Sequence, residues 1–210
     1  IVFFHGWKKS CEVLIERYFL WLFNWFFGKA DALIVLSNEN KQTLERWGVI
    51  RPIYKEVTII NDNELAGFDI EKALKSRQSS KTWRILFLAR IIREKGIYEA
   101  LEAFSLVQGK HPMVELIVAG DGVELDNVKS FARARNFHNV SFAGYIRDEE
   151  KRRSLEDAHI LCLPSYAEGC PVSVIEAMAY GLPVVTRSVG GVVDFFKNGR
   201  NGFISQSLDP

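Results

Sequence analysis

The stretch that decides the fold is HILCLPSYAEGCPVSVIEAMAYGLPVVT, residues 159–186. Both of its ends are short apolar runs, which is the pattern of strands buried on both faces of a sheet. Between them, residues 172–180 predict a helix that begins directly after Pro171 and ends at Gly181. Because a helix that joins two buried strands brings them side by side in the same direction, the stretch predicts a parallel strand–helix–strand unit.

The same alternation runs through the rest of the second half of the chain. Apolar runs predict strands, and amphipathic or charged runs between them predict helices. We therefore expect a doubly wound, parallel α/β sheet of Rossmann-like type, with a ligand beyond the carboxyl ends of its strands. The other predicted strands are 84–89, 114–120, 139–144 and 202–205, and the other predicted helices are 96–108, 124–136, 148–157 and 192–197.

The first 62 residues predict a second, partial Rossmann-like domain. Residues 63–82 are polar and predict a linker, and residues 83–210 form the predicted larger domain, which we expect to lack its last helices. The chain begins at Ile1 on an apolar run, so we expect its start to have been cut from something longer. The predicted elements of this first part are strands at 1–4, 32–37 and 57–61, and helices at 12–28 and 38–47, the latter capped by Ser37.

Charge and cysteine content exclude some classes of site. The 27 Lys+Arg and 26 Asp+Glu residues give a net charge of +1. A nucleic-acid-binding surface needs a concentrated excess of basic residues, so we expect no nucleic-acid partner. The three cysteines, Cys11, Cys162 and Cys170, lack metal-ligand spacing, so we expect no metal site and a reducing, cytoplasmic setting. The sequence shows no signal peptide.

Two glutamates bracket the start of the predicted 172–180 helix. Glu168 lies in the loop before it and Glu176 about two turns inside it. A helix N-terminus suits a phosphate, and Gly169 lets backbone approach a ligand closely. The helix neighbours of Glu176 are apolar, so its carboxylate is expected to be buried and to need partners such as ligand hydroxyl groups. The alternative is a loop acid and a structural buried acid.

Further polar residues follow other predicted strands. Arg90 and Lys95 come after a strand, where two cations can neutralise a diphosphate without a metal. Taken alone, they fit solvated surface charges equally well. Gly190-Gly191 and His5 also follow predicted strands, although a lone histidine in such a place is structural about as often as functional.

In their order and spacing, these residues resemble the group 1 glycosyltransferases of GT-B fold. Any one motif is weak, but the ordered set is quite specific. The resemblance extends from His5 to about Ile204, nearly the whole chain. It is carried by Arg90, Lys95-Gly96, Glu168-Gly169, Pro171, Glu176-Ala177-Met178, Gly181, Pro183 and Gly190-Gly191.

The resemblance implies a role for each matching residue. Arg90 and Lys95 would hold the diphosphate of a nucleotide sugar, and Glu176 would bind its ribose hydroxyls. Glu168 would contact the donor sugar and His5 would lie near the transferred sugar, which makes these two the candidate catalytic residues. The family retains the anomeric configuration and commonly needs no divalent metal for transfer. The backbone along the sugar and phosphate would be that of Gly169, Cys170, Pro171 and Val172.

The chain also departs from the family pattern. Ala89 stands where glycine often precedes Arg90, and Asp194 stands where a glutamate commonly follows Gly-Gly. Members carry a full N-terminal domain, whereas only about 60 residues of one are present here, against a usual domain size of roughly 100–150 residues. We therefore expect this chain by itself to bind the donor weakly and to transfer no sugar.

The expected function is transfer of a sugar, with retention, from a nucleoside diphosphate to a saccharide or lipid-linked acceptor. Two alternatives stay open. A GT-B phosphorylase or sugar-phosphate synthase uses similar parts, and a non-catalytic nucleotide-sugar-binding remnant is favoured by the partial N-terminal domain. Finding the open reading frame upstream of Ile1 would discriminate between an enzyme and a remnant.

The aromatic-rich helix predicted over 12–28 has two interpretations. It packs on the sheet of the partial domain, or it contacts the membrane surface with its Trp and Phe side chains, next to basic residues such as Arg17. The second would suit a lipid-linked acceptor and a peripheral location on the inner face of the membrane. Its apolar run is too short to span a bilayer, which takes about 20 residues.

Overall fold

The computed structural model of the chain describes residues 1–4, 9–56, 60 and 62–205. His5 and most of the predicted 57–61 strand lie outside the described residues. The chain divides into two compact units. The smaller unit comprises Ile1–Ile59, Ala167–Pro171 and Val189–Phe196, and the larger unit comprises Ile60–Tyr166, Val172–Ser188 and Lys197–Pro210.

The larger unit is built on a six-stranded sheet in which all neighbouring strands are parallel. The strand order is β6-β5-β4-β7-β8-β9, so the order reverses between β4 and β7. In doubly wound sheets this reversal point is where ligands bind, beyond the carboxyl ends of the strands. The strands are β4 (Trp83–Leu88), β5 (Val114–Ala119), β6 (Val140–Gly144), β7 (Ile160–Leu163), β8 (Val184–Arg187) and β9 (Gly202–Ser205).

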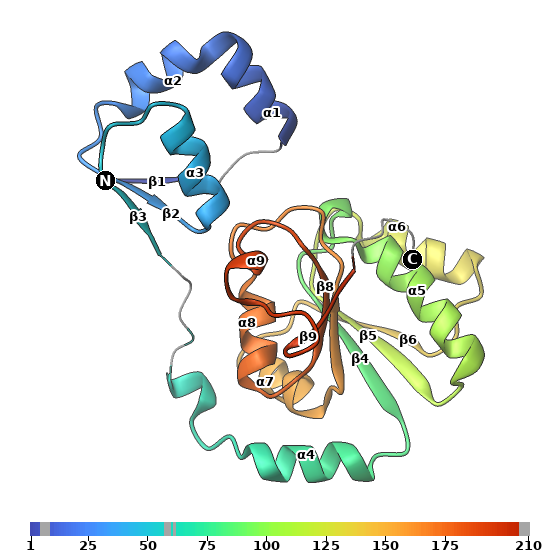
Figure 1. The fold of residues 1–210 in the computed structure, drawn as a ribbon. Coiled ribbons are helices and arrows are strands. Elements are labelled where there is room, and N and C mark those ends of the chain that lie inside the picture. The colour runs from blue at the N-terminus through green and yellow to red at the C-terminus, as the bar shows by residue number, and fades with distance from the viewer. Residues whose placement is uncertain (5–8, 57–59, 61, 206–210) are drawn as a thin grey trace. The chain divides into compact units, whose positions relative to one another are not determined.

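Helices cover both faces of this sheet (Figure 1). Helices α5 (Ile97–Lys110) and α6 (Leu125–Ala134) connect the strands on one side of the reversal point. Helices α7 (Asp148–Asp157) and α8 (Val172–Ala179) belong to the other side. Right-handed crossovers place these two pairs on opposite faces, because the chain changes direction across the sheet after β6. The predicted doubly wound, Rossmann-like α/β sheet is confirmed.

The smaller unit has a three-stranded parallel sheet in the order β1-β2-β3. The predicted cap of its last helix is confirmed, since Oγ of Ser37 accepts a hydrogen bond from the N–H of Asn40 at 3.1 Å. The segment predicted as one helix over 12–28 contains a π-helical stretch, η1. The elements are β1 (Val2–Phe4), α1 (Lys9–Leu14), η1 (Ile15–Phe19), α2 (Leu20–Phe27), β2 (Leu33–Val35), α3 (Asn38–Arg46) and β3 (Ile53–Lys55).

An aromatic cluster forms the core of the smaller unit. Phe23 of α2 packs edge-to-face on Trp47, with ring centroids 4.8 Å apart, and on Phe4 of β1, at 6.1 Å. Only one stripe of α2 is buried in this way, whereas Trp21 is 70% exposed and Phe26 is 65% exposed. Among the helices that the structure describes, none combines the length and the apolar character needed to cross a bilayer.

The segment predicted as a linker, 63–82, is largely helical. It contains η2 (Asp62–Leu65), a 3-10 helix, and the ten-residue helix α4 (Ile70–Ser79). The polar residues that indicated a loop instead cap α4 and attach it to the rest of the larger unit. The side chain of Asp69 accepts a hydrogen bond from the N–H of Lys72 at 3.0 Å and so caps α4. Polarity here reflects capping and docking rather than a solvated linker.

Arg77 docks α4 onto the rest of the larger unit. Its guanidinium donates to the carbonyl oxygens of Leu155 and Glu156 at the end of α7, at 3.1 and 3.0 Å. It also donates to those of Tyr180 and Gly181 after α8, at 3.0 and 3.5 Å. Helix C-termini leave carbonyl groups unsatisfied and carry partial negative charge. One buried cation therefore satisfies the ends of two helices.

We expect Arg77→Met to lower the free energy of unfolding by roughly 2–4 kcal/mol, because the carbonyl groups lose a charged donor in a buried place. Lys75→Met is the matched control, since Lys75 lies on the same helix and is exposed. Its effect should stay within about 0.5 kcal/mol. Urea unfolding followed by circular dichroism measures both, and equal effects of the two substitutions would contradict the docking role of Arg77.

Candidate functional site

Arg90 and Lys95 lie in one loop at the carboxyl end of β4. Arg90 is exposed, and its guanidinium makes no hydrogen bond or ion pair with the residues that the structure describes. Lys95 is half-buried and ends the 3-10 helix η3 (Arg93–Lys95), just before α5. Between them, the fully buried Ile91 donates its N–H to the carbonyl oxygen of Asp121 at 2.8 Å. Both cations are therefore carried by a loop whose backbone is fixed.

Gly96 holds this loop against the loop that follows β7. Its φ is 72°, and a Cβ at this position would overlap the carbonyl oxygen of Pro164. Nearby, the N–H of Tyr166 donates to the carbonyl oxygen of Glu94 at 2.8 Å. Because only glycine permits this backbone conformation at such a close approach, the loops after β4 and β7 meet at the reversal point of the sheet.

The expected burial of Glu176 in helix α8 is confirmed. The residue is 6% exposed, and its helix neighbours Val174 and Ala177 are fully buried. Nζ of Lys151, in α7, donates to Oε1 of Glu176 at 2.6 Å and to Oε2 of Glu64 at 3.2 Å. The other oxygen of Glu176, Oε2, accepts no hydrogen bond within the described part of the chain. The buried carboxylate is thus compensated by one cation, at one of its two oxygens.

Lys151, the partner of Glu176, is not indicated by any sequence motif. Burial lowers its pKa, but the hydrogen bonds and the charges of Glu176 and Glu64 outweigh burial, so that the pKa lies above its usual value. Lys151 therefore stays positively charged at neutral pH. It belongs to a run of charged residues in α7, and nothing in that run indicates which side chain turns toward a partner 25 residues away.

Glu168 and Gly169 belong to the smaller unit, where both are half-buried. The Gly190-Gly191 loop packs on their backbone, since the N–H of Gly191 donates to the carbonyl oxygen of Gly169 at 2.9 Å. Gly190 has a φ of 49°, and a Cβ there would overlap the carbonyl oxygen of Glu168. The two glycines therefore support the Glu168 loop.

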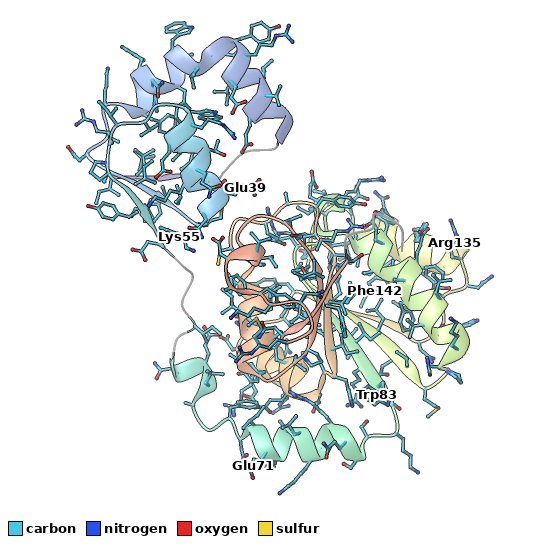
Figure 2. The ribbon with its side chains drawn as sticks, in the orientation of Figure 1. Glu39, Lys55, Glu71, Trp83, Arg135 and Phe142 are labelled. Atoms are coloured by element: carbon cyan, nitrogen blue, oxygen red, sulfur yellow. The ribbon has the colours of Figure 1, made fainter. Side chains whose placement is uncertain are left out.

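Asp194 has a structural role in the smaller unit, in α9 (Val192–Phe195). Its side chain is 8% exposed. Oδ2 accepts hydrogen bonds from the N–H of Asn38, at 2.8 Å, and from Nζ of Lys55, at 3.1 Å; Lys55 is labelled in Figure 2. Because the N–H of Asn38 is at the start of α3, the carboxylate also lies at a helix N-terminus, where negative charge is favourable.

The predicted site residues are divided between the two units. The larger unit contains Arg90, Lys95, Glu176 and Val172, and the smaller unit contains Glu168, Gly169, Cys170 and Pro171. Val172 is the first residue of α8 and is 44% exposed, whereas Pro171 is buried. In the part of the chain that the structure describes, no three His, Cys, Asp or Glu side chains gather in an arrangement suited to a metal ion.

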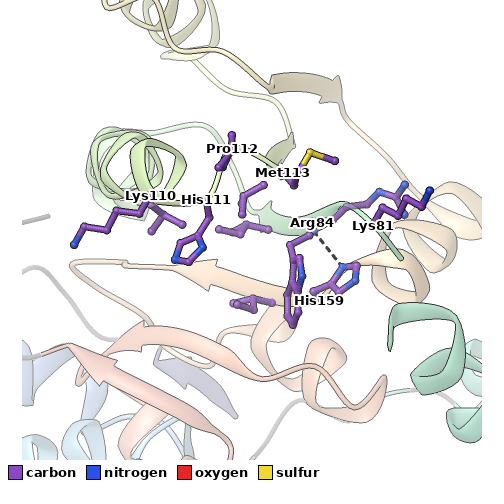
Figure 3. A pocket seen from close by; sticks show the side chains of 12 residues that line it. Lys81, Arg84, Lys110, His111, Pro112, Met113 and His159 are labelled. Atoms are coloured by element: carbon purple, nitrogen blue, oxygen red, sulfur yellow. Dashed lines mark hydrogen bonds between the residues drawn. The ribbon is translucent and has the colours of Figure 1, made fainter. Parts of the chain in front are cut away.

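A pocket of about 560 Å³ opens at the amino ends of β4, β5 and β7, and Arg84, His111 and Met113 are among the residues that line it (Figure 3). At its edge, Nδ1 of His159 accepts a hydrogen bond from the N–H of Arg84 at 3.1 Å. Nε2 of the same ring lies 3.1 Å from the carbonyl oxygen of Arg77, and burial lowers the pKa of His159, so the histidine is structural. None of the predicted site residues lines this pocket, which lies at the opposite ends of the strands from the edge where doubly wound sheets generally bind ligands.

Comparison with known proteins identifies related sequences. The family model for glycosyl transferases group 1 matches residues 69–210. Glycogen synthase of Mycobacterium tuberculosis (strain H37Rv) is 29% identical over 183 residues, which cover 85% of the chain and 42% of that protein. The capsular polysaccharide biosynthesis glycosyltransferase CapM of Staphylococcus aureus is 28% identical over 177 residues, which cover 83% of the chain and 44% of CapM. The chain therefore spans about half the length of the curated relatives it matches.

Solved structures share the fold. Anabaena HepE in complex with UDP-glucose superposes with a TM-score of 0.77 at 19% identity, covering 99% of the chain and 58% of HepE. Sucrose-phosphate synthase from Thermosynechococcus elongatus superposes with a TM-score of 0.79 at 22% identity, covering 99% of the chain and 55% of that protein. These likenesses confirm the expected GT-B fold class.

Proposed function

The chain belongs to the group 1 glycosyltransferase family, and on that premise we propose that it is the donor-binding part of a retaining, nucleotide-sugar-dependent glycosyltransferase. The proposed reaction transfers a sugar from a nucleoside diphosphate to a saccharide or lipid-linked acceptor. The bond between the anomeric carbon and the diphosphate oxygen breaks, and the acceptor oxygen bonds to the same carbon on the same face of the ring. The hydroxyl proton of the acceptor is released, and the nucleoside diphosphate leaves.

The proposal rests mainly on the positions of two cations and one buried carboxylate beside the reversal point of the sheet. Arg90 and Lys95 follow β4 on a fixed loop, and the buried carboxylate of Glu176 lies in the helix that follows the adjacent strand, β7. The departing diphosphate gains negative charge, which two preorganised cations stabilise. Ribose hydroxyls are neutral donors, which a carboxylate oxygen accepts. This combination suits a nucleoside diphosphate.

The remaining roles follow from the family pattern. The backbone of Gly169, Cys170, Pro171 and Val172 would run along the sugar and phosphate at the start of α8, where unpaired N–H groups favour an anion. Glu168 would contact the donor sugar, and His5 would lie near the transferred sugar. Glu168 and His5 are thus proposed to act on the reacting centre, whereas Arg90, Lys95 and Glu176 bind the nucleotide.

The exposed aromatic face of α2 supports a further part of the proposal, peripheral contact with a membrane. Trp21, Trp25 and Phe26 are 70%, 59% and 65% exposed, and Nζ of Lys29 lies 4.1 Å from the ring centroid of Trp25. Exposed aromatic side chains next to a cation suit the interface of an anionic bilayer. A lipid-linked acceptor would be reached from such a position.

We expect the chain to sediment with vesicles that contain anionic lipid, because aromatic burial and charge attraction add together. Replacement of Trp21, Trp25 and Phe26 by serine should reduce the bound fraction severalfold. Replacement of Trp83, which is 55% exposed in the larger unit, serves as the control and should leave it unchanged. Equal sedimentation of the triple variant and the unmodified chain would contradict membrane contact through residues 12–28.

Substitution of Glu176 and substitution of Glu168 should affect nucleotide affinity differently. Glu176→Ala should weaken binding of a nucleoside diphosphate by about tenfold or more, because a charged acceptor of the ribose is lost. Glu168→Ala should leave that affinity within about twofold, because its proposed contact is to the sugar, which the diphosphate lacks. Calorimetric titration with UDP, ADP and GDP measures both variants. Equal losses in the two would refute the assignment of ribose and sugar contacts.

Nucleotide binding should survive EDTA. The family pattern assigns two cations, Arg90 and Lys95, to the diphosphate, so we propose that no divalent metal is needed. Arg90→Ala should weaken binding by about tenfold, because charged hydrogen bonds to phosphate are lost. The titration is repeated in EDTA and then with added magnesium or manganese. A loss of affinity on chelation that either metal restores would show the metal-free proposal to be wrong.

The chain by itself should bind nucleotide weakly and transfer no sugar. Transfer needs the donor and the acceptor to be held in one geometry, and most of the acceptor-side domain of the family is not part of these 210 residues. Incubation with labelled nucleotide sugars and simple saccharide or lipid acceptors tests this. Transfer that disappears in Glu168→Ala and in Arg90→Ala would disprove the expectation, and it would also exclude the non-catalytic alternative.

A further inference from the structure

Lys151 lies between two carboxylates of the larger unit, one buried and one exposed. Its Nζ is 2.6 Å from Oε1 of Glu176 and 3.2 Å from Oε2 of Glu64. The side chain of Glu176 is 8% exposed, that of Lys151 is 26% exposed and that of Glu64 is 43% exposed. The lysine is therefore held from two sides, and its charge faces the buried carboxylate across a short hydrogen bond.

Glu64 is itself held in place by the core of the larger unit. The hydroxyl of Tyr180 donates to the backbone carbonyl oxygen of Glu64 at 2.7 Å. Tyr180 is 3% exposed and follows directly after α8, the helix that carries Glu176. The backbone that carries the exposed carboxylate is thus held by the residue that follows the helix carrying the buried one.

A buried carboxylate without a partner is costly and draws in water or a proton. One with a single fixed partner has a defined orientation, because the hydrogen bond to one oxygen determines the direction of the other. In Glu176 the fixed oxygen is Oε1, whereas Oε2 accepts no hydrogen bond from any described residue. An acceptor oriented in advance binds a ligand hydroxyl without further loss of side-chain freedom.

We infer that Lys151 is a positioning residue of the nucleotide site. It holds Oε1 of Glu176 so that Oε2 accepts a hydrogen bond from a ribose hydroxyl, and it thereby sets the preference of the site for ribonucleotides over deoxyribonucleotides. This inference rests on the proposed function, in which Glu176 binds the ribose. It adds a residue that acts on the ligand only through the carboxylate it orients.

The test is the ratio of two dissociation constants, measured on the 210-residue chain by NMR titration. UDP, ADP and GDP are each compared with their 2′-deoxy and 3′-deoxy counterparts, and the tightest-binding nucleotide is then used throughout. The unmodified chain should bind the ribonucleotide about tenfold more tightly than at least one deoxy counterpart, as for one hydrogen bond to a charged acceptor. A variant that is partly unfolded binds both ligands more weakly by the same factor, so this effect cancels in the ratio.

Lys151→Met should bind the ribonucleotide at most about twofold more tightly than its deoxy counterpart. Lys151→Arg keeps a cationic donor and should retain most of the preference of the unmodified chain. Arg153→Met is the matched control: Arg153 lies on the same helix, 72% exposed, and pairs only with Glu149 in the described part of the chain. Its ratio should not change. Glu64→Gln should cause a partial loss, because Lys151 keeps its other partner.

A double-substitution cycle separates positioning from a general structural effect. Glu176→Gln should remove the preference for the ribonucleotide, so that the two dissociation constants become about equal. Adding Lys151→Met to Glu176→Gln should cause no further change, because Lys151 acts through Glu176. If Lys151→Met does not fold, as circular dichroism would show, Glu64→Gln alone decides the matter. An unchanged ratio in Lys151→Met, or in Glu64→Gln in that case, overturns this inference alone. Failure of the unmodified chain to bind any of the three nucleotides overturns the proposed function instead.

Discussion

The larger unit depends on the close approach of the Gly96 backbone to the carbonyl oxygen of Pro164. A parallel sheet brings the carboxyl ends of all its strands to one edge, so the loops after β4 and β7 must turn in neighbouring space. They can meet because Gly96, at a φ of 72°, has no side chain to separate them. Arg90 consequently takes its position from the packing of backbone rather than from an acidic partner, and its charge stays available to an anion.

Glu176 differs from Arg90, because an ion pair stabilises its side chain. Its carboxylate is buried, so backbone packing alone cannot stabilise it, and it needs the charge of Lys151 at 2.6 Å. The two arrangements respond differently to solvent. An exposed cation such as Arg90 is screened by salt, whereas a buried ion pair is screened much less. In the proposed nucleotide site, the salt dependence of binding should therefore come mainly from the diphosphate end, whereas discrimination at the ribose should depend little on ionic strength.

Periodicity predicts the elements of the larger unit well, because strands buried on both faces and helices between them leave a strong pattern. The helix predicted over 148–157 has the bounds of α7 and the strand predicted over 202–205 has those of β9, and the other ends agree or differ by one or two residues. Polarity misleads at 63–82, where Asp69 and Arg77 serve a helix cap and a docking contact. Lys151 is missed for a related reason, since a contact across 25 residues depends on packing that no local pattern records.

The division of the candidate residues between the two units has a consequence for function. Arg90, Lys95 and Glu176 all lie in the larger unit, and each is positioned by contacts within that unit. Glu168 is supported by Gly190 and Gly191 within the smaller unit. In the proposed function, the side chains assigned to the nucleotide thus lie in one unit, whereas Glu168, which is assigned to the sugar, lies in the other. Under the proposed function, nucleotide binding and sugar transfer should therefore be separable by substitution, because different units carry the residues assigned to each.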